Sequence, residues 1–355
     1  MTIRLRAVMP LVVVGLLATA GCGSHATDAS GGSSPSQRTD AASTGAAATA
    51  PGTAGSPGRE RSGGASASST PEARGTATDM PVAPIRGVTS FAYQLQNYDD
   101  GTLDKIAAGP YQLAVVDLAR DAGSDYFTAN EIAAVKATGK RMLAYFEIGS
   151  IEDFRPEYGP IRSGASDLVL NRWDSWPQEY FVKYWDPRWW DDVIRPRIDR
   201  ALAAGFDGIY LDTPLAYEEL DLNLVPGRTR ADLARAMADL VIRMSQYAKT
   251  QRPGFQIVPQ NSPELREQSG YTAAIDGVGI EELFFLATDR PCDLDYCAEN
   301  LRNVRALHAA GKYVLAIDYA ERPENIRSAC ARYRTEGFAG YVGPLDLDTV
   351  APPCS

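Results

Sequence analysis

Eight short runs of residues typical of β-strands alternate with helical patterns along most of this chain, and this alternation limits the fold more than any other feature. Because parallel strands need a crossover between them, repeated strand–helix alternation predicts a parallel sheet. Eight such units in roughly 270 residues predict an α/β fold of the (β/α)8 barrel type, the TIM barrel. A doubly wound open sheet is the alternative, but no glycine-rich phosphate-binding turn follows the first run. The predicted strands cover residues 90–96, 113–119, 141–148, 208–213, 256–261, 277–283, 313–319 and 337–342, and the longer predicted helices cover 128–138, 189–204, 230–250, 297–310 and 323–335.

The first part of the chain has a different composition. Between residues 23 and 79 there is no Val, Ile, Leu, Phe, Tyr or Trp, so this tract cannot bury enough apolar surface to offset the entropy of ordering it. Before it, Arg4 and Arg6 precede an apolar stretch at 8–17, which is typical of an export signal. We therefore expect a signal peptide at 1–21, a flexible Gly/Ala/Ser/Thr/Pro-rich tether at 22–83 and one barrel domain at 84–355.

The five cysteines divide in the same way. Cys22 ends the segment 19–22, which resembles a bacterial lipobox, where the cysteine is acylated and becomes the N-terminus. We expect a protein lipid-anchored on the outer face of the bacterial cell membrane, and a secreted protein cut nearby is the alternative. The other four cysteines form an even set in an exported domain, which predicts disulfides with three pairings open. We favour the pairs Cys292–Cys297 and Cys330–Cys354.

Only two histidines occur, His25 in the tether and His308 in a predicted helix. This inventory excludes an HExxH motif, a histidine-rich zinc site and a Ser-His-Asp triad with a second histidine. An enzyme with this composition has to work with carboxylates, Lys, Tyr or Cys, and we expect no metal and no cofactor. The formal net charge of −10 argues against nucleic-acid binding and suits a cationic or neutral partner.

Polar side chains gather at the carboxyl ends of seven of the eight predicted strands. In a (β/α)8 barrel these ends carry the active site. Each residue alone could equally form a salt bridge or cap a helix, but agreement between seven strand ends points to a shared pocket. The polar ends comprise Gln94, Gln96, Asp117, Tyr145, Glu147, Tyr210, Asp212, Asn261, Glu281, Glu282, Asp318 and Tyr319. From them we expect substrate contacts at Gln94, Asp117, Glu147, Tyr210, Asn261, Glu282, Asp318 and Tyr319.

All five tryptophans fall within eighteen residues, at 173, 176, 185, 189 and 190. Most of them belong to the segment 149–186, a long loop after the third predicted strand, and on the barrel model this loop covers the active face. Flat aromatic rings can present apolar faces to sugar rings, so we expect Trp173 and Trp176 to contact substrate. Trp189 and Trp190 fit better as residues that open the next helix and pack in its interface.

Asp212 and Glu281 are the strongest candidates for a catalytic pair. Strand alternation puts Asp212 on the same face as Tyr210, and Glu281 on the same face as Gly279, whose missing side chain would leave space in front of the carboxylate. Glycoside cleavage needs two carboxyl groups that flank the scissile bond, one ionised and one protonated. Two carboxylates at one end of a barrel can meet that geometry without histidine or metal.

The run 205–212, Gly-Phe-Asp-Gly-Ile-Tyr-Leu-Asp, resembles a segment of the TIM-barrel enzymes of glycoside hydrolase family 114, the endo-α-1,4-polygalactosaminidase family. Other pieces agree in order along the chain: residues 93–96 resemble the family's first strand, residues 149–156 its GSYEDWRP segment, Trp176 with Glu179 its W-x-x-E, and residues 276–281 its strand that ends in a catalytic Glu.

The resemblance implies that Asp212 and Glu281 are the catalytic acid and the nucleophile or base. Because the second position reads Glu281-Glu282, the register could instead favour Glu282. The chain departs from the family after the first carboxylate, where it reads Thr-Pro-Leu-Ala-Tyr at 213–217. We add Asp153, from the stretch 149–156, and Tyr217, from the stretch 213–217, to the expected substrate contacts.

The resulting hypothesis is a monomeric, exported endo-glycosidase that cleaves an α-1,4-linked galactosamine polysaccharide, with Asp212 ionised and Glu281 as proton donor. Such polymers are cationic when deacetylated, which suits the acidic domain. Two alternatives stay open: a surface polysaccharide-binding lipoprotein without activity, and a barrel hydrolase for another glycan. Membrane contact is expected only through the lipid anchor. Retention or inversion depends on the distance between the carboxylates, which the sequence does not give.

Overall fold

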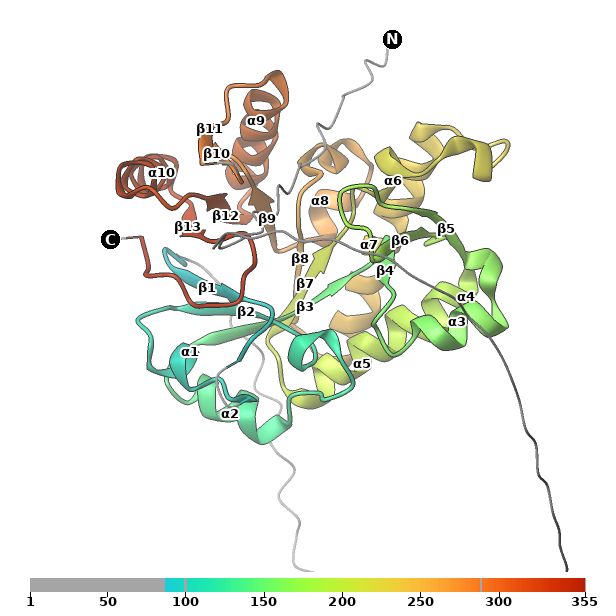
Figure 1. Cartoon of the computed structure of the whole chain (residues 1–355), viewed down its shortest axis with the longest axis horizontal. Coiled ribbons are helices and arrows are strands. Elements are labelled where there is room, and N and C mark those ends of the chain that lie inside the picture. The colour runs from blue at the N-terminus through green and yellow to red at the C-terminus, as the bar shows by residue number, and fades with distance from the viewer. Residues whose placement is uncertain (1–86, 99–100, 288, 355) are drawn as a thin grey trace, which may run out of the picture. The chain divides into compact units, whose positions relative to one another are not determined.

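A closed barrel of eight parallel strands forms the centre of the domain (Figure 1). The computed structural model describes residues 87–98, 101–287 and 289–354. Five strands pair in the order β1-β2-β3-β7-β8 and three in the order β13-β12-β9. Single parallel bridges, Ser90 to Gly340 and Gln260 to Gly279, join the two sheets. The barrel strands are β1 Phe91–Gln94, β2 Leu113–Asp117, β3 Arg141–Glu147, β7 Gly208–Asp212, β8 Gln256–Pro259, β9 Gly277–Glu281, β12 Tyr313–Tyr319 and β13 Ala339–Gly343. All eight predicted strands, and the predicted fold, are confirmed.

Helices surround the barrel and end where the sequence predicts stops. Thr229 and Asp232 form a capping box that starts the longest helix, and Gly205, at φ 86°, ends the helix before β7 in a left-handed conformation. The helices are α1 Asp104–Ala108, α2 Ala129–Lys136, α3 Tyr158–Gly164, α4 Pro187–Trp189, α5 Arg195–Ala204, α6 Ala216–Glu219, α7 Arg230–Gln251, α8 Tyr271–Ala274, α9 Asp295–Ala309 and α10 Pro323–Glu336, with 3-10 turns at Arg120–Ala122, Ser166–Leu168, Leu222–Leu224 and Pro263–Glu267 and a π-helical turn at Trp190–Ile194.

The segment after β3 is not the plain loop that the sequence analysis expected. It forms a three-stranded antiparallel sheet in the order β4-β6-β5, and α3 lies between β4 and β5 along the chain (Figure 1). These strands have only three or four residues each, too few for an alternating pattern to stand out in the sequence. The strands of this sheet are β4 Ser150–Glu152, β5 Val169–Arg172 and β6 Glu179–Val182, and a separate hairpin has strands β10 Phe285–Leu286 and β11 Arg290–Pro291.

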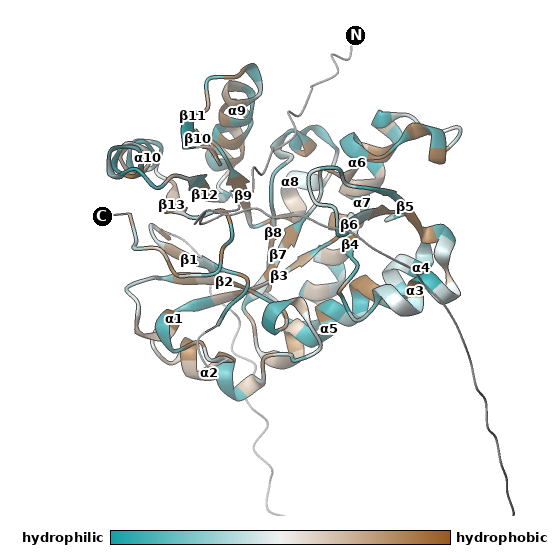
Figure 2. Ribbon diagram, in the orientation of Figure 1, coloured by the Kyte–Doolittle hydropathy of each residue, from teal (hydrophilic) through white to brown (hydrophobic). Residues whose placement is uncertain are grey.

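Strand alternation divides the buried side chains into two groups. One set packs outward against the helices, and Figure 2 shows the hydrophobic strands lying between helices with mixed surfaces. The other fills the barrel, where Tyr93, Tyr210 and Tyr341 pack with aliphatic side chains of neighbouring strands. In the pairing register, Tyr145 lies beside Tyr210 and Glu147 beside Asp212. The interior is therefore aromatic in its middle and acidic at the carboxyl end of the strands.

Both favoured disulfide pairs are present. Cys292 is bonded to Cys297 and Cys330 to Cys354, which ties the C-terminal segment to α10. The predicted signal peptide at 1–21, the lipidation site Cys22 and nearly all of the predicted tether lie outside the described residues. Among the residues that the structure does describe, no helix is long and apolar enough to cross a membrane.

Candidate active site

Asp212 and Glu281 face each other at the carboxyl end of the barrel, on either side of β8. Asp212 ends β7 and Glu281 ends β9. Each continues an inward-facing row, after Tyr210 on β7 and after Gly279 on β9. This geometry is consistent with the expectation that two carboxylates on different strands meet at one end of the barrel.

Three groups hold the Asp212 carboxylate. Oδ1 accepts hydrogen bonds from the Thr213 backbone N–H at 2.6 Å and from Gln260 Nε2 at 3.0 Å. Oδ2 accepts the hydroxyl of Tyr145, which comes from the interior row of β3. These donors fix both the position and the rotation of the carboxylate.

Glu281 has a matching arrangement. Its Oε2 accepts hydrogen bonds from Gln260 Nε2 at 2.7 Å and from Asn261 Nδ2 at 2.9 Å, and its Oε1 accepts the hydroxyl of Tyr319. Because Gln260 Nε2 reaches both carboxylates, Asp212 Oδ1 and Glu281 Oε2 lie no more than about 5.7 Å apart, the sum of the two hydrogen-bond lengths.

Burial controls the charge of the pair. Removal from water, together with the nearby charge of Asp212, raises the pKa of Glu281 to about 7. Burial also raises the pKa of Asp212, but the hydrogen bonds from Tyr145 and from the Thr213 backbone oppose that rise. Near neutral pH the arrangement therefore favours one protonated and one ionised carboxyl group, the combination that acid–base cleavage of a glycosidic bond requires.

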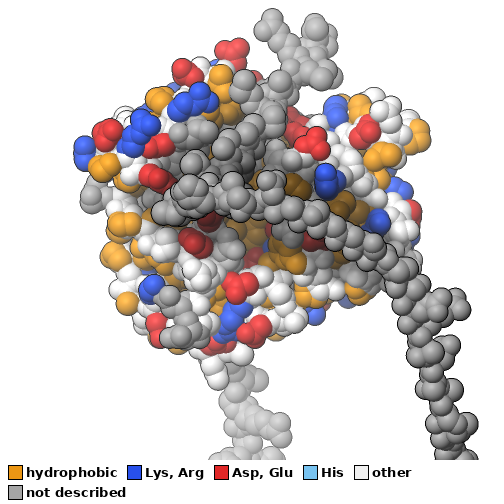
Figure 3. Space-filling model, in the orientation of Figure 1, with side chains coloured by type: hydrophobic (Ala, Val, Ile, Leu, Met, Phe, Trp, Pro, Cys, Tyr) orange, Lys and Arg blue, Asp and Glu red, His pale blue; other side chains and the backbone are white. Residues whose placement is uncertain are grey.

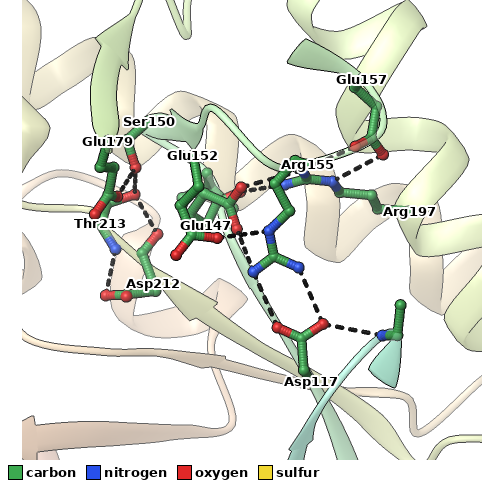
Figure 4. A network of polar contacts seen from close by, with 12 residues as sticks. Asp117, Glu147, Ser150, Glu152, Arg155, Glu157, Glu179, Arg197, Asp212 and Thr213 are labelled. Carbon is green, nitrogen blue, oxygen red and sulfur yellow. Dashed lines mark hydrogen bonds and ion pairs between the residues drawn. The ribbon is translucent and has the colours of Figure 1, made fainter. Parts of the chain in front are cut away.

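A buried ion cluster lies beside Asp212, where β2 and β3 end (Figure 4). Arg155 donates to both oxygens of Asp117, at 3.0 and 2.9 Å, and its guanidinium also lies 3.1 Å from Glu147 and 2.7 Å from Glu152. Arg197 contacts Glu147 from the other side, at 3.1 Å. Asp117 and Glu147, both expected to contact substrate, are thus buried as partners of arginines.

Glu152 is the exposed member of this cluster. Its side chain is 24% exposed, and burial together with the charge of Glu147 raises its pKa to about 7. Glu179 lies on the other side of Asp212, with its carboxylate bonded to the Ser150 hydroxyl, and burial raises its pKa well above the usual range. Figure 4 shows Glu152, Glu179 and Asp212 around the same part of the site.

Gly279 has a different role from the one that its sequence position suggested. The expected free space in front of Glu281 is absent, because the Tyr210 hydroxyl occupies the place where a side chain on residue 279 would begin. Tyr210 is fully buried. Glycine here lets the Tyr210 ring cross the barrel interior beneath the carboxylate pair.

Two other predicted contacts have structural roles. The amide of Gln94 donates to the backbone carbonyls of Gln96, Asn97 and Asp348. Asp318 is fully buried, and it accepts hydrogen bonds from the backbone of Phe284 and Phe285 at 2.8 Å and from a buried tyrosine hydroxyl. Protein groups thus occupy both oxygens of Asp318 and the amide nitrogen of Gln94, and these atoms do not face the carboxylate pair.

The register at the second carboxylate favours Glu281 over Glu282. Glu282 has a positive φ of 52°, and its Oε1 accepts the Ala287 backbone N–H at 2.7 Å instead of facing Asp212. Asn261 and Tyr319, in contrast, both contact Glu281 directly. Tyr217 is buried and donates to Glu264 instead of to the pair.

The tryptophans divide between packing and exposure. Trp189 is fully buried and donates to the Ile148 carbonyl at 2.9 Å, and Trp190 packs beneath Arg243, as expected for residues that open a helix. Trp173 packs on the neighbouring Phe181 with ring centroids 5.3 Å apart. Trp176 alone among the five is strongly exposed, at 48%.

Trp176 lies in the turn between β5 and β6, near the exposed Asp153, whose backbone N–H donates to the Gln178 carbonyl. On the face seen in Figure 3, acidic side chains lie among hydrophobic ones near the middle of the domain. Within residues 87–98, 101–287 and 289–354, no group of three or more His, Cys, Asp or Glu side chains is arranged to hold a metal ion.

Sequence reasoning missed Gln260, Arg155, Glu152 and Glu179 as site residues. Gln260 directly precedes Asn261 at a strand end, so the same strand-end rule could have found it. The other three lie in stretches that resemble the family, residues 149–156 and Trp176 with Glu179, but their place in the site depends on an antiparallel sheet that was not foreseen.

Comparison with known proteins agrees with this geometry. A family model described as glycoside-hydrolase family GH114 matches residues 69–355. An uncharacterised protein of Deinococcus radiodurans is 35% identical over 265 residues, which cover 74% of this chain and 83% of that protein. An uncharacterised protein of Thermotoga maritima is 30% identical over 270 residues, covering 73% and 81% of the two chains.

Two solved structures share the fold. The glycoside hydrolase domain of PelA from Pseudomonas aeruginosa is 22% identical with a TM-score of 0.58, covering 75% of this chain and 98% of that one. Aspergillus fumigatus Ega3, solved in complex with galactosamine, is 16% identical with a TM-score of 0.58, covering 78% of this chain and all of the other.

Proposed function

This chain belongs to glycoside-hydrolase family GH114, and we propose from that premise that it hydrolyses a galactosamine-containing polysaccharide with Asp212 and Glu281 as its catalytic pair. The observation that carries the assignment of residues is the bridging amide of Gln260, which holds one oxygen of each carboxylate within about 5.7 Å of the other.

In the proposed reaction Asp212 is the nucleophile and Glu281 the general acid. The Asp212 carboxylate attacks the anomeric carbon while the bond from that carbon to the leaving oxygen breaks, and Glu281 gives its proton to that oxygen. Water then attacks the anomeric carbon, returns a proton to Glu281 and releases Asp212. The pKa of about 7 suits Glu281 to both proton transfers.

The acidity around the pair supports a cationic sugar as substrate. Glu152 lies beside Asp212, and burial together with the charge of Glu147 raises its pKa to about 7, so the protonated amine of a galactosamine unit would stabilise its ionised form. The Ega3 structure was solved with galactosamine, which points to the same class of sugar. Trp176 and Asp153 are proposed as contacts to more distant sugar units.

We place the enzyme outside the cytoplasm. Two disulfides fit a protein that folds in an oxidising compartment. The sequence of residues 1–21 is typical of an export signal and that of 22–83 of a tether, so we propose a domain held off the membrane by acylation of Cys22, with secretion in free form as the alternative.

The test is the release of reducing ends from partly deacetylated α-1,4-galactosamine polymer. Wild-type protein should cleave it, Asp212→Asn and Glu281→Gln should not, and Glu282→Gln should retain most of the activity. Binding of the polymer without cleavage by the wild type would support the binding-protein alternative. If the protein cleaves a different glycan from a panel instead, the proposed substrate is wrong but the assignment as a glycoside hydrolase stands.

A further inference from the structure

The Gln260 side chain occupies an unusual place between the two carboxylates. It follows β8, the strand between those that carry Asp212 and Glu281, and its backbone bridges to Gly279 while its N–H bonds to the Leu211 carbonyl. The residue is 3% exposed. One amide nitrogen carries two hydrogens, and here each hydrogen is directed to a different carboxylate.

Tyr93 fixes which end of this amide faces the pair. Its hydroxyl donates to Gln260 Oε1 at 2.8 Å, and burial raises the pKa of Tyr93 well above the usual range, so the hydroxyl keeps its proton. A reversed amide would place its oxygen against two carboxylate oxygens. The tyrosine therefore holds the donor end toward Asp212 and Glu281.

The hydrogen-bond donors around each carboxylate make its two oxygens different. Asp212 Oδ1 accepts two N–H groups, from Thr213 and Gln260, and Glu281 Oε2 also accepts two, from Asn261 and Gln260. A carboxylate oxygen has about two lone-pair positions, so these two oxygens are saturated. The partner oxygens, Asp212 Oδ2 and Glu281 Oε1, each accept only a tyrosine hydroxyl and keep one position free.

We propose that Gln260 is a positioning residue that selects the working oxygen of each carboxylate: Oδ2 of Asp212 for attack and Oε1 of Glu281 for proton donation. This inference rests on the proposed function of the pair. Gln260 touches neither the sugar nor the reacting atoms in this scheme, and it acts by occupying the other two oxygens and by stabilising the ionised forms.

Gln260→Leu removes both donors in a side chain of similar size. Loss of a hydrogen bond to an anion raises its pKa, so the apparent pKa values of both carboxyl groups should rise by about one unit. Both limbs of the pH profile of kcat/KM should move upward with them, and kcat should fall on the order of 100-fold. Gln256→Leu is the matched control, because Gln256 is buried on the same strand at its other end and donates to Gly254; its profile should match that of wild type.

The pKa values are also measured without substrate, from ¹³C-carboxyl NMR titrations assigned with Asp212→Asn and Glu281→Gln. Unchanged carboxyl pKa values in folded Gln260→Leu would overturn the proposal. If that variant does not fold, the same titration is made on Tyr93→Phe. A rise in both carboxyl pKa values supports the inference, and unchanged pKa values overturn it. A wild type that cleaves no galactosamine polymer would refute the proposed function, while the titration would still decide the role of Gln260.

Discussion

The Tyr210 hydroxyl fills the position that a side chain on Gly279 would need, directly beneath the carboxylate pair. Tyr210 comes from β7 and Gly279 from β9, so the ring spans the barrel interior under β8. The floor of the candidate site is thus a tyrosine ring accommodated by a glycine.

Gly279→Ala should destabilise the domain and reduce activity. The added methyl group would overlap the buried Tyr210 ring, and overpacking of this kind costs about 1–3 kcal/mol. Urea unfolding and hydrolysis rates would measure both effects. Gly159→Ala is the control, because a methyl group at that helical position of α3 meets no atom within 4 Å, and a stability loss equal to that of Gly279→Ala would contradict the prediction.

Unfolding free energy should fall as pH rises from about 4.5 to 7. Glu281 and Asp318 both have pKa values raised to about 7 by burial, so in this window the folded state binds more protons than the unfolded state. Each group contributes a slope of up to about 1.4 kcal/mol per pH unit. Glu281→Gln should flatten the measured dependence, and an equally steep curve for this variant would contradict the assignment.

Arg155→Met should destabilise the protein by about 3–5 kcal/mol. The change would leave the buried carboxylates of Asp117 and Glu147, and the partly exposed carboxylate of Glu152, without their shared cation. Arg188→Met breaks an ion pair with Asp167 and Asp186 whose arginine is 44% exposed, so it should cost less than about 1 kcal/mol. Chemical denaturation of both variants tests the contrast.

Trp176→Ala should raise KM for long polymer about tenfold and leave kcat on short oligosaccharides unchanged. The ring is exposed on the sheet after β3, so its removal should cost sugar contact and little packing. Trp189→Ala is the opposite case, because that ring is fully buried and its loss should lower the melting temperature. Equal KM values for Trp176→Ala and wild type on long polymer would remove Trp176 from the substrate path.

Hydrolysis should retain the configuration at the anomeric carbon. Retaining enzymes have carboxyl groups about 5–5.5 Å apart and inverting enzymes roughly 6.5–9.5 Å apart, and the oxygens bridged by Gln260 lie within about 5.7 Å. Proton NMR of the first product formed would show the α-anomer before it equilibrates. Initial release of the β-anomer would contradict this prediction, because inversion requires a water between the two carboxylates that attacks the anomeric carbon.

The sequence predicted the barrel because its strands are separated by helices with clear ends. The alternation of side chains along each strand then put Asp212 on the same face as Tyr210, and Glu281 on the same face as Gly279. The hydrogen-bond network was not predictable in the same way. That Tyr145 serves Asp212 and Tyr319 serves Glu281 depends on the register between strands far apart in the chain. The β4-β6-β5 sheet, which carries Glu152 and Glu179, has strands too short to leave a periodic pattern.

The barrel closes between β8 and β9 through one of its two isolated bridges, that of Gln260 to Gly279, and this has a consequence for the chemistry. Asp212 belongs to the five-stranded sheet and Glu281 to the three-stranded one, so the two carboxylates stand on opposite sides of a seam. The gap between them is set by how tightly that seam closes. Changes at residues 260 and 279 could therefore shift a relative of this enzyme between stereochemical outcomes while both carboxylates stay in place.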